Sequence, residues 1–91
     1  MVDQLGDRTS EKYKKCMLVL NGYEFTAAAI REGALDEGLY KRMQYTMVVR
    51  DWDVLCPFVM ELRRLDTHPT LFQEFHWLAE RWQANPLKAT K

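Results

Sequence analysis

The sequence has few of the features that mark enzymes and nucleic-acid-binding proteins. It contains two cysteines, four glycines and three prolines in 91 residues, and its 13 basic side chains balance 13 acidic ones. A net charge of zero argues against the basic surface that binding to phosphates requires. No Cys-x-x-Cys, His-Glu-x-x-His, Gly-x-Ser-x-Gly or glycine-rich phosphate loop occurs. We therefore expect no enzymatic activity, no metal, no cofactor and no nucleic-acid partner.

Long apolar runs are also absent. A membrane-spanning helix needs about 20 predominantly apolar residues, and no uncharged run approaches that length. The polar start of the chain has no apolar signal core. Cys16 and Cys56 lie within apolar stretches, where a thiol behaves as a small buried hydrophobe and is inert. These features predict a cytoplasmic protein that does not contact the membrane.

Apolar residues are plentiful and follow the period of an α-helix. From residue 13 they recur every three or four positions: Tyr13, Cys16, Leu20, Tyr23, Ala27 and Ile30. Thr9 or Ser10 can cap the start of this helix, and Gly33 favours its end near Glu32. The alternative is a β-hairpin turning at Asn21-Gly22, although the helical period continues through that dipeptide.

A second helix is predicted from residue 37 to 65, with Asp36 as its N-cap. Its expected core face is Met43, Met47, Val54, Phe58, Leu62 and Leu65. Pro57 removes the amide that would bond to the carbonyl of Asp53, so we expect a kink there. The alternative is two helices that break between residues 50 and 53.

A third helix is predicted from the capping box Thr70-Leu71-Phe72-Gln73 to residue 83 or 84, where Asn85-Pro86 follows. Its core stripe is Leu71, Phe75, Leu78 and Trp82. The predicted fold is an all-α three-helix bundle built on a long antiparallel helical hairpin, over residues 9–84. Residues 1–8 form a flexible arm and residues 85–91 a flexible tail in this prediction.

Both long helices are apolar on a second face, which a short third helix cannot cover. The expected second faces are Leu18, Gly22, Phe25 and Ala29, and then Tyr45, Val49, Trp52, Cys56 and Met60. Exposed apolar strips of this kind mark interfaces. Leu18, Gly22, Phe25, Ala29, Tyr45 and Trp52 are therefore interface candidates, together with Trp77, which points away from the stripe of the third helix. We expect a homodimer through one of the two long helices.

The polar residue Glu24 falls on the core face of the first predicted helix, and Arg50 falls on that of the second. In an antiparallel hairpin the two lie about one turn apart, which predicts a half-buried structural ion pair. Arg31 is the alternative partner of Glu24. His76 and Glu80 are spaced four residues apart on one helix face, but two such ligands do not make a metal site.

Four segments resemble a known family: Val19-Leu20-Asn21-x-x-Glu24-Phe25-x-Ala27, Ile30-Arg31-x-Gly33-x-Leu35-Asp36, Pro57-Phe58-Val59-x-Glu61-Leu62-Arg63 and Pro69-Thr70-x-Phe72-x-x-Phe75-x-Trp77-Leu78-Ala79-x-Arg81-Trp82. The resemblance is to a bacterial and phage family of small helical domains of unknown function, over residues 12–83. Its members often carry membrane helices ahead of this domain, and this sequence starts at the domain itself. The resemblance implies a helical fold and no particular activity.

The function expected from these patterns is that of a non-catalytic protein-binding module. Small size and the resemblance to a phage family suggest an inhibitor of a host defence or regulatory protein. The alternative is a small helical DNA-binding regulator, which needs a basic helix to contact base edges. The third predicted helix carries only Arg81 within its regular turns, which argues against that alternative.

Overall fold

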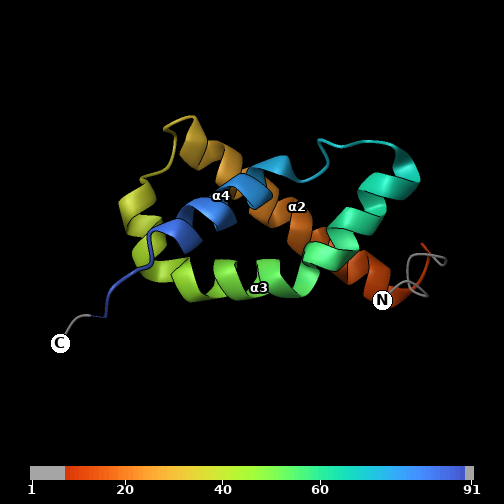
Figure 1. Ribbon diagram of the computed structural model, residues 1–91, viewed down its shortest axis with the longest axis horizontal. Coiled ribbons are helices and arrows are strands. Elements are labelled where there is room, and N and C mark those ends of the chain that lie inside the picture. The colour runs from red at the N-terminus through yellow and green to blue at the C-terminus, as the bar shows by residue number, and fades with distance from the viewer. Residues whose placement is uncertain (1–7, 90–91) are drawn as a thin grey trace.

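The computed structural model describes residues 8–89, which form three α-helices and no strand (Figure 1). They are α2 (Glu11–Arg31), α3 (Glu37–Asp66) and α4 (Gln73–Ala84). The all-α prediction is confirmed, and the helix continues through Asn21-Gly22 where a hairpin was the alternative. The parts of the predicted arm and tail at residues 1–7 and 90–91 lie outside the described residues. Among residues 8–89, no helix combines the length and apolar character that crossing a bilayer requires.

Local capping sets the ends of the two long helices. The side chain of Ser10 accepts a hydrogen bond from the backbone N–H of Tyr13 at 3.1 Å, which satisfies one of the free amides at the start of α2. After α2 ends, Gly33 adopts a φ of 83°, a left-handed conformation that glycine reaches without steric cost. At the start of α3, Asp36 Oδ1 accepts from the N–H of Gly38 at 3.0 Å. The predicted N-caps Ser10 and Asp36 and the predicted stop at Gly33 are confirmed.

α3 is one continuous helix, as predicted, and the alternative of a break between residues 50 and 53 does not occur. Pro57 lies inside it on the exposed side, where water can satisfy the carbonyl that loses its partner. Figure 1 shows the helix changing direction between its green middle and its teal end, the region of Pro57, as the predicted kink requires. The left-handed residue Thr67, with a φ of 53°, ends α3.

The start of α4 differs from the prediction. The expected capping box does not form, because Phe72 occupies the N-cap position in a left-handed conformation and no side chain of the adjacent sequence caps the helix. Instead, the carboxylate of Glu24 on α2 accepts from the N–H of Phe75 at 2.9 Å and from that of Glu74 at 3.3 Å. A negative charge beside the free amides of a helix N-terminus is stabilising. The first turn of α4 is therefore completed by α2.

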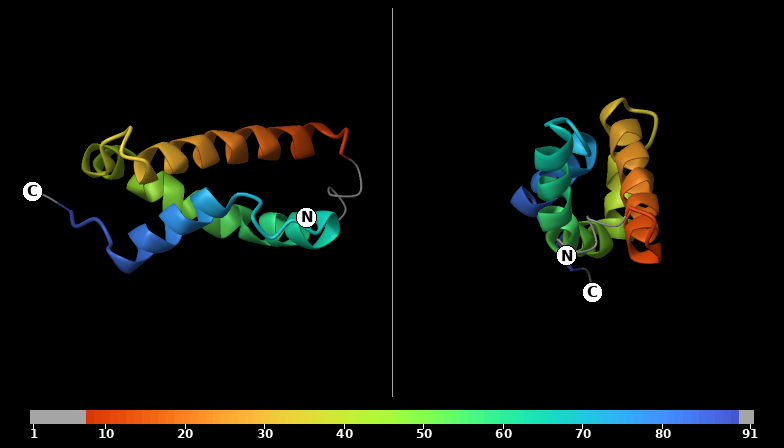
Figure 2. Two further views of the ribbon diagram at one scale, coloured as in Figure 1. Left: turned by 90° about the horizontal axis from the view of Figure 1, so that it is seen from above. Right: turned by 90° about the vertical axis from the view of Figure 1, so that its right-hand side faces the viewer.

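α4 holds the two long helices together. It packs closely against both α2 and α3, whereas α2 and α3 contact each other over a short stretch only (Figures 1 and 2). The predicted helical hairpin is thus present but open, with α4 on one side of it. Between the three helices lie the buried residues Leu20, Ala27, Ile30, Val48, Trp52, Leu55, Phe58, Val59, Leu62, Phe72, Phe75, Leu78, Ala79 and Trp82.

A second link joins the start of α3 to the end of α4. The carboxylate of Glu37 accepts two hydrogen bonds from Arg81, at 2.7 and 3.1 Å, and one from the indole N–H of the fully buried Trp82 at 3.0 Å. The Arg81 guanidinium holds the pKa of Glu37 below its usual value. Glu24 and Glu37 therefore fix the two ends of α4 to α2 and α3.

Candidate functional site

The side of α2 that faces away from the core carries two large exposed side chains. Leu18 is 75% exposed and Phe25 is 76% exposed. Gly22 lies between them, and a Cβ built on it would meet no heavy atom within 4 Å. Ala29 is half-buried and continues the same line towards the C-terminal end of α2. These four residues, called the α2 strip below, match the predicted second face of this helix.

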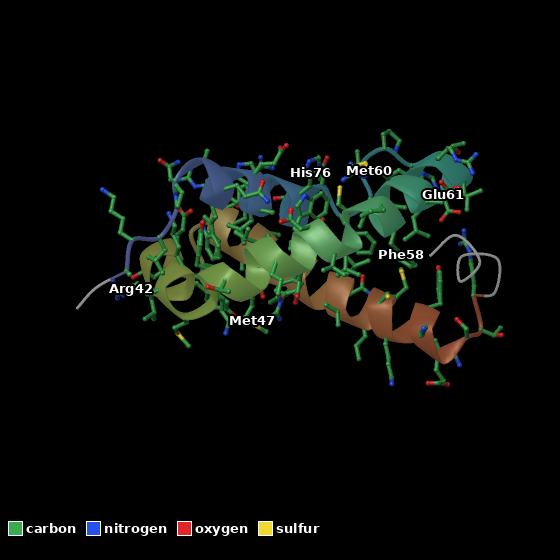
Figure 3. All side chains as sticks on the ribbon, turned by 60° about the horizontal axis from the view of Figure 1, so that its bottom comes forward. Arg42, Met47, Phe58, Met60, Glu61 and His76 are labelled. Atoms are coloured by element: carbon green, nitrogen blue, oxygen red, sulfur yellow. The ribbon has the colours of Figure 1, made fainter. Side chains whose placement is uncertain are left out.

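On α3 the predicted core and outer faces are exchanged over the first five turns. Met43, Met47 and Val54 were expected in the core and are exposed. Trp52 was an interface candidate and is 4% exposed, with its ring edge against Phe75 at a centroid distance of 5.1 Å. Figure 3 shows Met47 on the side of α3 that faces away from α4. The apolar surface of α3 available to a partner is therefore its methionine-containing side.

The remaining two interface candidates are half-buried. Tyr45 packs towards Trp82, with 6.3 Å between the ring centroids. Trp77 carries the guanidinium of Arg31 over its ring at 4.5 Å from the centroid, and that of Arg81 at 5.6 Å. Both guanidinium groups also pair with carboxylates, Arg31 with Glu74 and Arg81 with Glu37. Trp77 thus belongs to a surface network of stacked and paired charges.

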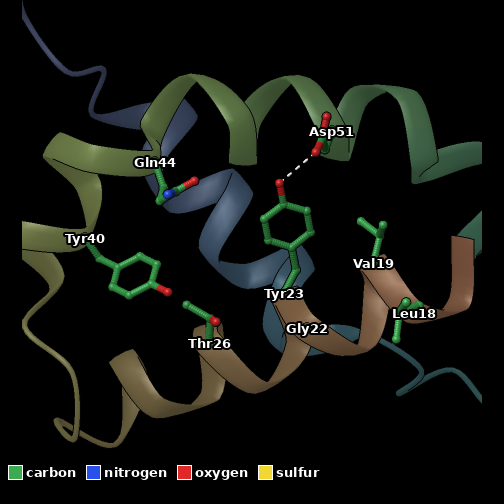
Figure 4. Close-up of a pocket in the computed structure, with 8 residues that line it drawn as sticks. All are labelled: Leu18, Val19, Gly22, Tyr23, Thr26, Tyr40, Gln44 and Asp51. Atoms are coloured by element: carbon green, nitrogen blue, oxygen red, sulfur yellow. Dashed lines mark hydrogen bonds between the residues drawn. The ribbon is translucent and has the colours of Figure 1, made fainter. Parts of the chain in front are cut away.

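An open groove separates α2 from α3 where the two helices diverge. Its larger part has a volume of about 400 Å³ and is lined by Leu18, Val19, Gly22, Tyr23, Thr26, Tyr40, Gln44 and Asp51 (Figure 4). A smaller hollow of about 250 Å³ shares Val19 and Asp51 with it and continues towards Lys15 and Val54. Figure 4 shows α4 behind the groove, so the groove lies on the face of the helix pair that α4 leaves open.

One hydrogen bond crosses the groove and joins its two walls. The hydroxyl of Tyr23 on α2 donates to Asp51 Oδ2 on α3 at 2.7 Å (Figure 4). The Tyr23 ring also stacks on the buried Phe75 of α4, at 4.5 Å between centroids and 19° between planes. Burial, and then the hydrogen bond to Asp51, raise the pKa of the Tyr23 phenol well above its usual value. Tyr23 therefore connects the floor of the groove to the core.

An alkaline titration followed by tyrosine absorbance is expected to show the raised pKa of Tyr23 in the folded protein. Because the folded state raises the pKa of Tyr23, the stability that its neutral form contributes is fully present below pH ~10, the usual phenol pKa, and is lost as the pH rises through the folded value. Tyr23→Phe should remove the last ionisation step of the wild-type titration. A titration curve that loses an early step instead would contradict the link to Asp51.

The predicted ion pair between Glu24 and Arg50 does not exist. Glu24 caps α4, as described above, and Arg50 Nε lies 3.3 Å from Asp51 Oδ1, with a second contact to Met47. The alternative partner Arg31 pairs with Glu74 at 2.9 Å. The prediction failed because it paired Glu24 with a side chain, whereas its actual partners are backbone amides of a third helix.

Within residues 8–89 no group of three histidine, cysteine or acidic side chains is placed to hold a metal ion. His76 stacks on Trp52 at 4.6 Å and lies 3.3 Å from Glu80, and both cysteines are free and half-buried. What the groove and its borders present is apolar surface with a few polar groups among it.

Sequence reasoning missed the groove, and with it Tyr23, Asp51, Met43, Met47 and Val54. The signal that was available is the pair Arg50 and Asp53 in the middle of α3, both exposed, because charged residues three positions apart on a helix mark its solvent side. Giving these charges more weight than the methionines turns the helix to its observed orientation.

Comparison with known proteins gives a family and no function. No curated protein and no solved structure matches the chain. The model of a family described as a domain of unknown function, DUF4760, matches residues 3–82. This agrees with the resemblance in the sequence to a family of unknown function. Since the match spans most of the 91 residues, the chain belongs to the DUF4760 family.

Proposed function

We propose that the chain is a non-catalytic protein-binding module whose binding surface is the open face of the α2–α3 pair. The observation that carries this proposal is the exposure of Leu18 and Phe25, each about three-quarters accessible, of which Leu18 also lines the groove. On α3, Val54 lines the smaller hollow of the groove, and Met43 and Met47 are exposed on the same helix. Contiguous exposed apolar side chains of this kind mark interaction sites.

The composition of this face suits a protein surface as its ligand. Protein interfaces have an apolar centre with a polar rim, and methionine is enriched in them because its flexible side chain adapts to a partner. Here Val19 and Leu18 border the groove, while Gln44, Thr26 and Asp51 supply polar groups. A partner helix or loop with apolar side chains would bury the former and hydrogen-bond to the latter.

The charges favour a protein over a nucleic acid. Five arginines each pair with a carboxylate of the same chain: Arg8 with Asp66, Arg31 with Glu74, Arg50 with Asp51, Arg64 with Glu61 and Arg81 with Glu37. These pairs neutralise the side chains on which phosphate contacts depend. Arg81, the arginine on α4 that a DNA-binding role would use, is among them.

A host defence or regulatory protein is the partner class that we propose to test first. This narrower expectation comes from the resemblance of the sequence to a bacterial and phage family of small helical domains. The proposed binding surface does not depend on this choice of partner class.

Affinity capture tests the surface. A tagged chain is expressed in its own cells beside Phe25→Asp, and bound proteins, including untagged copies of the chain, are identified by mass spectrometry. We expect Phe25→Asp to lose the specifically bound protein, because it places a charge in the apolar contact. Leu65→Asp is the matched control, since Leu65 is 47% exposed and lies at the far end of α3. Equal recovery with both variants would overturn the proposed surface.

A further inference from the structure

We propose that the α2 strip joins two copies of this chain in an antiparallel, two-fold symmetric pair centred on the peptide bond between Asn21 and Gly22. The inference names the partner for the protein-binding surface proposed above and rests on that proposal. Three observations on α2 carry it: the placement of its two large exposed side chains, the open space at Gly22 and the distribution of its charges.

The large side chains are placed symmetrically about this centre. Leu18 lies as far before the Asn21–Gly22 bond as Phe25 lies after it, about 5 Å along the axis at a rise of ~1.5 Å per residue. In an antiparallel pair of α2 helices, Leu18 of each copy therefore lies opposite Phe25 of the other. A two-fold contact buries each of these exposed side chains twice, once in each copy.

The centre of the pair must let the two helix backbones come close. Gly22 lies there, and beyond its chain neighbours and the backbone of its own helix no heavy atom of the chain comes within 4 Å of the position of a Cβ. Glycine at a helix crossing removes the side chain that would hold the axes apart, as small residues do at close helix contacts. Glycine in a helix interior costs about 1 kcal/mol relative to alanine, and the space at Gly22 would admit a side chain in a single chain.

Opposite charges follow at each end of the strip. Lys14 and Glu32 are 18 positions apart, which at ~100° per residue is five full turns, so Glu32, the C-cap residue directly after α2, continues the edge of the helix on which Lys14 lies. In the antiparallel pair, Lys14 of one copy lies about one turn from Glu32 of the other. Both are exposed, and neither takes part in an ion pair among the described residues. The pair is therefore complementary in charge as well as in shape, with Lys14 and Lys15 outweighing Glu11 at the same end.

Sedimentation equilibrium over a range of micromolar concentrations tests the proposal with the full chain. We expect a reversible monomer–dimer equilibrium. Lys14→Glu should weaken the dimer about tenfold, since it replaces two attractive contacts with two repulsive ones. The double variant Lys14→Glu/Glu32→Lys should restore the dissociation constant to within about threefold of the wild type. Because the two side chains are five turns apart in one chain, only a contact between chains can produce this rescue.

Gly22→Gln separates association from folding. Glutamine favours a helix, and its side chain enters open space in a single chain, so the melting temperature of the monomer should not fall. The dimer should weaken at least tenfold, because the new side chain separates the two helices. Lys12→Glu is the control for Lys14→Glu, since Lys12 lies in the same turn as Lys14 but away from the α2 strip, and it should leave the dissociation constant unchanged.

Each other outcome overturns the proposal. A dimer that is insensitive to Gly22→Gln and to the charge exchange would exclude this geometry. A monomer at every concentration would exclude a second copy as the occupant. If such a monomer still captures another protein in a Phe25-dependent manner, the proposed function stands with a different partner. If that capture is also absent, both proposals fail.

Discussion

Glu24→Ala is expected to lower the free energy of unfolding by about 2–4 kcal/mol, because it removes a carboxylate that accepts from two backbone amides and stabilises a helix N-terminus. No side chain near the start of α4 can replace it, since Phe72 occupies the N-cap position. For a domain of this size each kcal/mol lowers the melting temperature by about 4–8 °C. Urea unfolding followed by circular dichroism measures the free energy of unfolding, and thermal unfolding followed in the same way measures the melting temperature.

Two variants show which interaction of Glu24 is lost. Glu24→Gln keeps an oxygen acceptor without the charge, so it should lose about half as much stability as the alanine variant. Arg50→Ala should change the free energy of unfolding by less than about 0.5 kcal/mol, since Arg50 is exposed and does not contact Glu24. An Arg50→Ala variant as unstable as Glu24→Ala would show that an ion pair, and not the cap, is what matters.

Phe75→Ala is expected to have the largest effect on folding, about 3–5 kcal/mol. Phe75 is fully buried, stacks on Tyr23 and meets the ring of Trp52 edge to face, so the substitution leaves a cavity where all three helices meet. A domain of this kind has a total stability of only about 5–15 kcal/mol. The variant should therefore be partly unfolded at physiological temperature, with a lower urea midpoint and exposed apolar surface that binds dye.

Phe25→Ala is the matched control, because it removes the same side chain from a site that is 76% exposed. It should leave the urea midpoint of the monomer almost unchanged and weaken association only. Equal destabilisation by the two substitutions would show that Phe25 packs within its own chain. A stable Phe75→Ala variant would show that the three helices do not depend on a common aromatic centre.

The sequence was sufficient for the helices and their caps, since these depend on local chemistry. Ser10, Asp36 and Gly33 act within a few residues of their own positions, and each does what its type predicts. The orientation of α3 could not be read in this way. Its two faces are similarly apolar, and the packing of α4 against Trp52 rather than against the methionines decides which one is buried.

The candidate site was predicted only in part, because only part of it depends on local chemistry. The α2 strip follows from the pattern of a single helix and has the expected exposure at Leu18, Gly22 and Phe25. The groove depends on the relative placement of two helices, and the Glu24 cap depends on a partner that lies 50 positions further along the chain. Neither the groove nor the Glu24 cap has a local sequence signal. The Thr70–Gln73 capping box was misleading because the left-handed backbone at Phe72 keeps it from forming.

The cap supplied by Glu24 also bears on the order of folding. A helix of 12 residues is marginal in water on its own, and two amides in the first turn of α4, those of Glu74 and Phe75, find their acceptor on α2. Its nucleation therefore waits until α2 is formed and close by, and the last segment of the chain is added to a surface already prepared by the first. We therefore expect closure of the loop between Glu24 and Glu74, rather than helix propagation, to limit the rate at which this small domain completes its structure.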